Sequence, residues 1–293
     1  MAKIAHLEKW LGSSVTRAPG GTYRHRVLKE DATRWPHVQA RIKQYFRSAH
    51  SDAVRRLRRL ATGSLHPLKK KRASQDVADR YPHTLEMTTL KGYFGEVMSS
   101  AVAEAFDVCG HNDWKVPGFL FRVHIAAFQK LEAQRQLGGA VGTVFGRTGD
   151  DSLAFRRDPS SGAIIGVLYC EAKCTADHDS SMVSDAHEKL NGPGPLDVLS
   201  LIEVLLDDPN PESVEWVDAL RTFRDNQASG TIQRYNAAYY ICGRHPASKS
   251  TWMDPAVPHA SYRSPGRVLE SVEVHLTDVE TNIRAIYSPE GWR

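Results

Sequence analysis

Apolar residues recur every three or four positions in several stretches of the chain, a spacing that predicts amphipathic helices. The pattern is clearest over residues 89–106 and is also present over 34–60. A short helix is expected over residues 4–11. Four further helices are predicted over residues 180–189, 196–206, 212–226 and 278–287.

Four shorter apolar runs have the length and composition of β-strands. The first two, at residues 152–155 and 163–174, flank a Pro-, Ser- and Gly-containing segment at 158–162 that is typical of a hairpin turn. The other two lie at residues 236–243 and 271–276, and the proline-rich stretch between them predicts a long loop. Strands and helices in this order predict an α/β fold, with a mixed central β-sheet flanked by helices.

Composition narrows the class of protein. Apolar residues make up 41% and charged residues 25% of the 293 residues, as in ordinary globular domains. No apolar run approaches the ~18 residues of a membrane-spanning helix, so we expect no membrane contact. Four cysteines in a chain of this length do not indicate a disulfide scaffold, and a cytoplasmic location is expected.

Charge is distributed unevenly along the chain. Residues 1–85 hold 19 Lys and Arg against 6 Asp and Glu, whereas residues 86–293 hold 19 against 28. This asymmetry predicts a basic, mainly helical N-terminal region followed by a separate domain. Such a region binds DNA phosphates, docks on an acidic partner protein or is simply a solvated surface. The candidate nucleic-acid-binding residues are Arg55, Arg56, Arg58, Arg59, Lys69, Lys70, Lys71 and Arg72.

The candidate chemistry lies at the end of the strand predicted over 163–174. Glu171 and Lys173 are two residues apart, so both side chains project from the same face of that strand. Asp151 lies 20 residues before Glu171, across the predicted hairpin, and strand pairing can bring the two carboxylates together. Asp150 is an alternative to Asp151. Two carboxylates beside a lysine are suited to holding Mg²⁺ next to a phosphate.

Another carboxylate stands within the apolar pattern of the helix predicted over 89–106. Glu96 lies beside Val97 and Met98, and a carboxylate on or near a buried face is costly unless a cation or a metal compensates it. We therefore expect Glu96 to face Lys173 or a metal ion.

These residues resemble the motif of the PD-(D/E)xK nuclease superfamily. The matching positions are Asp151 and the triplet Glu171-Ala172-Lys173, and Glu96 matches a carboxylate that the preceding helix often supplies. The proline of the motif is absent, because Asp150 precedes Asp151.

The resemblance implies a restriction-endonuclease-like core in residues 86–293 and the activity of a Mg²⁺- or Mn²⁺-dependent deoxyribonuclease. It implies that Asp151 and Glu171 hold the metal and that Lys173 positions the attacking water. It also implies that Glu96 assists, directly or through water. In this superfamily the next helix often adds a basic or polar residue, for which the candidates are His187 and Lys189.

The order of these motifs also resembles the HamA family, the nuclease subunits of the Hachiman anti-phage defence system, over about residues 85–290. The resemblance implies a defence effector that cleaves DNA together with a helicase or ATPase partner of the HamB type. Two other interpretations remain open. One is a non-catalytic DNA-binding or assembly subunit, and the other is a nuclease of the DNA-repair or resolvase type.

Overall fold

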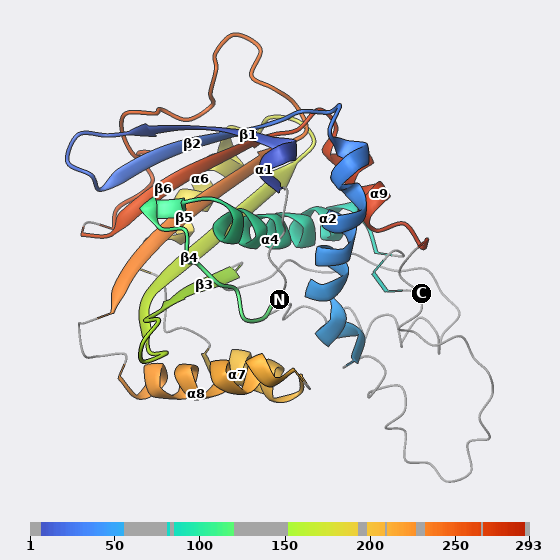
Figure 1. Ribbon diagram of the computed structural model, residues 1–293. Coiled ribbons are helices and arrows are strands. Elements are labelled where there is room, and N and C mark those ends of the chain that lie inside the picture. The colour runs from blue at the N-terminus through green and yellow to red at the C-terminus, as the bar shows by residue number, and fades with distance from the viewer. Residues whose placement is uncertain are drawn as a thin grey trace, which may run out of the picture.

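The computed structural model describes residues 7–55, 81–82, 85–119, 152–192, 198–208, 210–226, 232–264 and 266–290. Within these ranges the chain forms a six-stranded sheet in the order β1-β2-β6-β5-β4-β3 (Figure 1). The four central strands run parallel to one another, and each end strand is antiparallel to its neighbour. The strands are β1 (Leu11–Arg17), β2 (Tyr23–Glu30), β3 (Ser152–Arg157), β4 (Ile164–Thr175), β5 (Gln233–Cys242) and β6 (Val268–His275).

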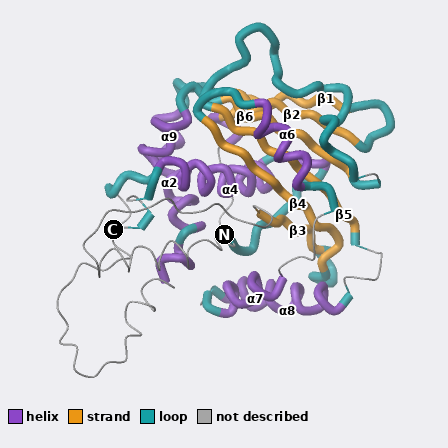
Figure 2. Tube along the Cα trace, turned by 180° about the vertical axis from the view of Figure 1, so that it is seen from behind, coloured by secondary structure: helices purple, strands orange, loops and turns teal. Residues whose placement is uncertain are grey.

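Helices cover both faces of this sheet. One face is covered by α1 (Leu7–Trp10), α2 (Trp35–Ala49), α4 (Met87–Ala105) and α9 (Val279–Ile286), with the short 3₁₀ turn η2 (Val108–Gly110). The other face is covered by α6 (Ser180–Lys189), α7 (Val198–Leu206) and α8 (Pro211–Asp225) (Figure 2). The expected mixed α/β architecture is therefore confirmed. None of the helices in the described ranges is long and apolar enough to cross a bilayer.

Helix α4 lies against the sheet because its apolar side is nearly continuous. Phe94, Val97 and Met98 are buried, as the pattern over 89–106 predicted. Gly95 allows a close approach, because a Cβ built there would lie 3.5 Å from the Cβ atoms of both Ala172 and Cys174 on β4. The helix is thus seated directly on the strand that carries the candidate catalytic pair.

The hairpin between β3 and β4 forms as predicted. Asp158 accepts hydrogen bonds from the backbone N–H groups of Ser160 and Ser161, and Gly162 adopts the left-handed region with φ +71. In the ladder that follows, Ser152 pairs with Cys170. The turn therefore fixes the register that brings the start of β3 to the middle of β4, one residue before Glu171.

The N-terminal region differs from its prediction. Residues 11–30 were expected to be helical or irregular, but they form β1 and β2, and β2 is hydrogen-bonded in parallel to β6. Arg24 and Arg26 are buried in β2 because both pair with Glu270 on β6 and with Asp107. These partners lie far away in the sequence, so a local pattern could not show that a strand with this many charges is interior.

The apolar core also crosses the expected boundary at residue 85. Phe46 of α2 stacks on Phe94 of α4 with ring centroids 5.4 Å apart, and both rings belong to the core cluster that includes Trp10 and Val272. The helix predicted over 34–60 is present as α2 and is followed by helical residues 51–55.

Candidate active site

Glu171 and Lys173 lie near the carboxyl end of β4. Both project towards the side of the sheet covered by α6, and the Lys173 ammonium lies 3.1 Å from Glu171 Oε1. The Glu171 side chain is 3% exposed, whereas that of Lys173 is 20% exposed. The prediction that the two residues share one face is confirmed, and the lysine reaches solvent while the carboxylate does not.

A second lysine approaches the same carboxylate from α6. Lys189 is the last residue of that helix, and its ammonium lies 2.9 Å from Glu171 Oε1. Asp179 caps the beginning of α6 by accepting a hydrogen bond from the backbone N–H of Ser181 at 2.9 Å. Two cations thus surround one carboxylate, and the resulting positive charge suits a phosphate-bearing ligand.

The strand register extends this polar surface across the sheet. Glu171 is aligned with Ala238 on β5, and Ala238 is aligned with Ser271 on β6. The Ser271 hydroxyl lies 2.8 Å from Nε2 of His187, whose Nδ1 lies 2.8 Å from the carbonyl oxygen of Val183. Because a carbonyl oxygen only accepts, His187 donates from Nδ1 and accepts at Nε2. Burial lowers the pKa of His187 to about 4, so this imidazole is a neutral interior residue that fixes α6 to β6.

Glu96 is placed differently from the catalytic pair. It is buried on α4, which packs on β3 and β4 as expected. However, α4 covers the face of β4 that carries Ala172 and Cys174, and Glu171 and Lys173 project from the opposite face. Helix α4 therefore lies on the face of β4 opposite to Lys173, and the expectation that Glu96 faces Lys173 or a metal ion stays a prediction.

Along one edge of β4, side chains from the two faces of the sheet can approach each other. The Ser99 hydroxyl, one turn after Glu96 on α4, lies 3.1 Å from the hydroxyl of Ser152 at the start of β3. In the described residues the pairing of β3 with β4 begins at Ser152 and Cys170, and β4 continues beyond that point without a described neighbour on this side. A site that joins Glu96 to Glu171 would have to form around this edge.

Asp150 and Asp151, the remaining predicted carboxylates, lie outside the described residues. Within the described ranges, no group of three or more His, Cys, Asp and Glu side chains is arranged to hold a metal ion. The described part of the site supplies the carboxylate of Glu171 and two ammonium groups. Those groups alone do not make a magnesium site, because Mg²⁺ requires oxygen ligands.

Among the predicted nucleic-acid-binding residues, the structure describes only Arg55. Its guanidinium forms ion pairs with Asp52 and, at 3.6 Å, with Asp208. Arg55 is therefore engaged by two carboxylates of its own chain. The other seven residues lie outside the described ranges: Arg56, Arg58, Arg59, Lys69, Lys70, Lys71 and Arg72.

Sequence analysis missed Glu273 of β6, a buried carboxylate with many hydrogen-bond partners. It contacts the ring nitrogens of His25 at 2.9 Å and His275 at 2.8 Å, and accepts from the backbone N–H groups of Trp252 at 2.9 Å and Met253 at 2.8 Å. Burial alone would raise the pKa of Glu273, but these bonds hold it at about 2. They fix the long loop between β5 and β6 to the sheet. The sequence predicted a strand at residues 271–276 and a long loop before it, but not the contact between them.

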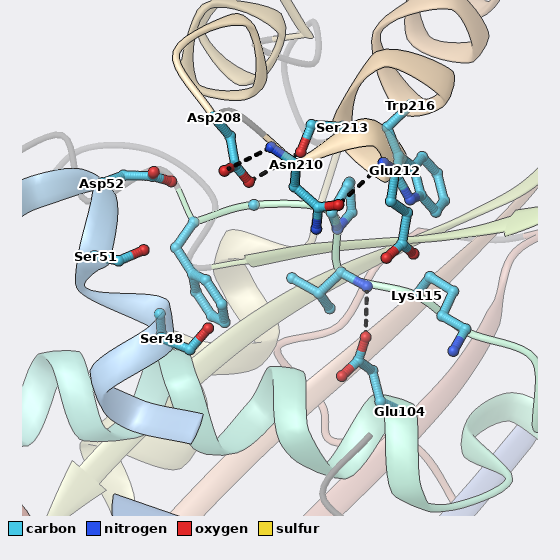
Figure 3. Close-up of a pocket in the computed structure, with 15 residues that line it drawn as sticks. Ser48, Ser51, Asp52, Glu104, Lys115, Asp208, Asn210, Glu212, Ser213 and Trp216 are labelled. Atoms are coloured by element: carbon cyan, nitrogen blue, oxygen red, sulfur yellow. Dashed lines mark hydrogen bonds between the residues drawn. The ribbon is translucent and has the colours of Figure 1, made fainter. Parts of the chain in front are cut away.

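A cavity of about 220 Å³ lies between the end of α2, the end of α4 and the start of α8 (Figure 3). Burial raises the pKa of Glu104 in its wall, whose carboxylate accepts a hydrogen bond from Val116 N–H at 3.0 Å. Asp208 accepts one from the Ser213 hydroxyl at 2.9 Å. This acidic lining does not suit a phosphate. The carboxylates around the cavity are Asp52, Glu104, Asp208 and Glu212.

Comparison with known proteins does not identify a function for this site. No family model matches the chain, and no curated protein is similar enough to be identified as a relative. The function is therefore inferred from the residues of this chain alone.

Proposed function

We propose that this protein is a metal-dependent nuclease that hydrolyses phosphodiester bonds in DNA. The observation that carries the proposal is the convergence of Lys173 and Lys189 on the buried carboxylate of Glu171. This cluster lies towards the carboxyl end of a parallel strand, the position where open α/β sheets bind their ligands. It also lies beside a hairpin in which the residue before Ser152 is Asp151.

In this proposal Glu171 and Asp151 hold Mg²⁺ or Mn²⁺, which when bound would polarise the scissile phosphate. Lys173 orients the attacking water and stabilises the negative charge that develops on the phosphate. Lys189 contributes a second positive charge and keeps the carboxylate of Glu171 in place. Glu96 would act around the edge of β4, through a water molecule, rather than by direct contact with Lys173.

The proposal is tested by incubating the purified protein with supercoiled plasmid in Mg²⁺, in Mn²⁺ and in EDTA. Metal-dependent nicking or cutting is expected, with loss of at least about 10³-fold in rate for Glu171→Gln, Lys173→Ala and Asp151→Asn. Glu188→Gln and Lys249→Ala serve as controls because both remove one exposed charge outside the cluster. Cutting at an unchanged rate by the Glu171 and Lys173 variants would sink the mechanism.

A second candidate function is a non-catalytic DNA-binding or assembly subunit. It is favoured by the same ion pairs, because two lysines already neutralise Glu171 Oε1 in the described residues. Under this alternative Lys173→Ala weakens DNA binding or complex assembly, and no metal ion supports cutting by the unaltered protein.

The resemblance to the HamA family extends the proposal to an anti-phage effector that works with a helicase partner. A helicase gene next to the gene of this protein, together with protection against phage that requires both that helicase and Lys173, would support this role. Protection that persists in Lys173→Ala would instead separate defence from the proposed cleavage.

A further inference from the structure

A positively charged hollow lies beside α1 and the first half of α2, on the face of the sheet opposite to the one from which Glu171 projects. Its volume is about 630 Å³. Three permanent cations, Lys9, Arg34 and Arg41, line it together with His37, against the single carboxylate of Asp31. The remaining lining residue, Val38, is the one apolar residue among those that line the hollow in the described part of the chain.

Arg41 lies on a helix without acidic residues, α2, Arg34 directly precedes that helix, and Lys9 lies on α1. Residues 35–49 of α2 contain no Asp or Glu, and Arg34, His37 and Arg41 follow one another at spacings of three and four residues, all exposed. Residues at this spacing share one side of a helix. With a rise of about 1.5 Å per residue, the row extends for about 10 Å.

These charges are available to a ligand. Within the described residues neither Lys9 nor Arg41 has an ion-pair partner, and Arg34 contacts Asp31 at 3.6 Å. Many exposed arginines elsewhere are paired, as Arg221 is with Asp218. The Asp31 carboxylate accepts hydrogen bonds from the hydroxyl and the backbone N–H of Thr33, and these bonds lower the pKa of Asp31. The hollow therefore carries a net positive charge that the described residues do not neutralise.

We propose that this hollow binds the sugar–phosphate backbone of DNA. Long, exposed cations spread over about 10 Å suit a row of phosphates better than one small anion. Most of the lining side chains are charged and suit phosphates rather than base edges, so the contact would position the nucleic acid without reading its sequence. In this proposal the hollow supplies part of the DNA binding that sequence analysis predicted for residues 55–72.

The hollow and the candidate active site lie at the same end of the sheet but against opposite faces. β2 and β4 run parallel, α2 begins five residues after β2 ends, and Lys173 lies near the carboxyl end of β4. Helices α1 and α2 cover one face, whereas Glu171 and Lys173 project towards α6 on the other. The hollow is therefore a DNA contact separate from the candidate active site. This inference rests on the proposed function only in naming DNA, rather than another polyanion, as the ligand.

The test measures binding without cleavage. Affinity for a 20-base-pair duplex is measured in EDTA over a range of salt concentrations for the unaltered protein and for the triple variant K9A/R34A/R41A. Each lost phosphate contact should reduce the magnitude of the log–log salt slope by about 0.9, so a total decrease of about 2–3 and at least about ten-fold weaker binding are expected. The charge-retaining variant K9R/R34K/R41K should bind nearly normally.

The matched control is R221A/R224A/K249A, which removes the same charge from exposed sites on α8 and the loop after β5. A triple variant that binds DNA no more weakly than this control overturns the inference, as does an unaltered protein that fails to bind DNA. Loss of a copurifying protein with unchanged DNA affinity also overturns it and identifies the hollow as an acidic-protein docking site. If DNA binding depends on the hollow but no metal supports cutting, the proposed function fails and this inference stands.

Discussion

Lys189 and Glu171 join the end of α6 to the end of β4 through a contact of 2.9 Å between Nζ and Oε1. Lys173 approaches the same oxygen at 3.1 Å from within β4. The two lysines differ in their exposure, 44% for the Lys189 side chain and 20% for that of Lys173. This difference predicts that they are unequal in catalysis.

We expect Lys189→Met to reduce the rate of DNA cleavage by about 10–100-fold, because it removes one of two positive charges beside the phosphate. Lys173→Met should cost at least ten-fold more, since the Lys173 side chain is the less exposed of the two and is held in place by its strand. Single-turnover cleavage rates measure both effects. Equal losses for the two variants would contradict the separate roles, and Lys249→Met is the control for a lysine removed elsewhere.

Glu171→Gln is expected to leave the protein folded. The variant leaves two lysines beside a neutral amide, a defect that costs about 3–5 kcal/mol when all partners are buried. Both ammonium groups reach water here, so we expect a smaller loss of about 1–2 kcal/mol in the free energy of unfolding. Urea denaturation measures it. A loss much larger than this would show that lost activity in Glu171→Gln reports unfolding rather than chemistry.

Much of the fold around this site was predictable from local pattern. Helix α6 occupies residues 180–189 as predicted, and the hairpin of β3 and β4 follows from its apolar runs and its turn residues. The lysine at the end of α6 was a candidate, but its contact with Glu171 depends on how far α6 leans over the sheet, which no sequence spacing encodes.

The parts that could not be predicted depend on partners far apart in the sequence. Strand β2 contains Arg24, His25 and Arg26, which look like surface residues. They are buried because Glu270 and Glu273 of β6 meet them across the sheet. In the same way, the position of Glu96 depends on which face of β4 helix α4 packs against. The periodicity of the helix does not determine that face.

The carboxylate of Glu273 should be a major source of stability. Glu273→Gln removes a charged acceptor that serves two histidines and two backbone N–H groups, so we expect a loss of about 2–4 kcal/mol at pH 7. Because the pKa of Glu273 is held at about 2 in the folded state, its contribution is present above the unfolded pKa near 4.5 and is lost as pH falls towards 2. The difference between variant and unaltered protein should therefore shrink below pH 4.5.

Limited proteolysis locates the effect of the Glu273 change. The loop over residues 244–264 should be cut faster in Glu273→Gln, because its anchor at Trp252 and Met253 is weakened. Cutting elsewhere at the same relative rate would show general unfolding instead.

His187 predicts a second, separate pH dependence. Burial lowers its pKa from 6.5 to about 4 in the folded protein, so the unfolded chain binds more protons between these values and stability falls as pH decreases through that window. The loss between pH 7.5 and pH 5 should be about 2 kcal/mol for this group. Urea unfolding of His187→Asn should show a flatter pH profile over this range.

Two glycines of α4 test how closely that helix must approach β4. At Gly92 a Cβ would meet nothing within 4 Å, whereas at Gly95 it would lie 3.5 Å from the Cβ atoms of Ala172 and Cys174. Gly92→Ala should therefore stabilise the protein by about 0.5–1 kcal/mol, because alanine restricts the unfolded chain and favours the helix. Gly92→Leu places the larger side chain in open space and should be close to neutral.

Gly95→Leu should instead cost about 1–3 kcal/mol more than Gly92→Leu, because the side chain must force α4 away from the strand. Since β4 carries the catalytic pair, the same displacement should slow DNA cleavage in Gly95→Leu at a temperature where the variant is still folded. Thermal unfolding and cleavage rates of the two leucine variants provide the comparison. If both variants lose the same stability and activity, α4 does not set the position of β4. The proposed action of Glu96 around the edge of β4 would then be wrong as well.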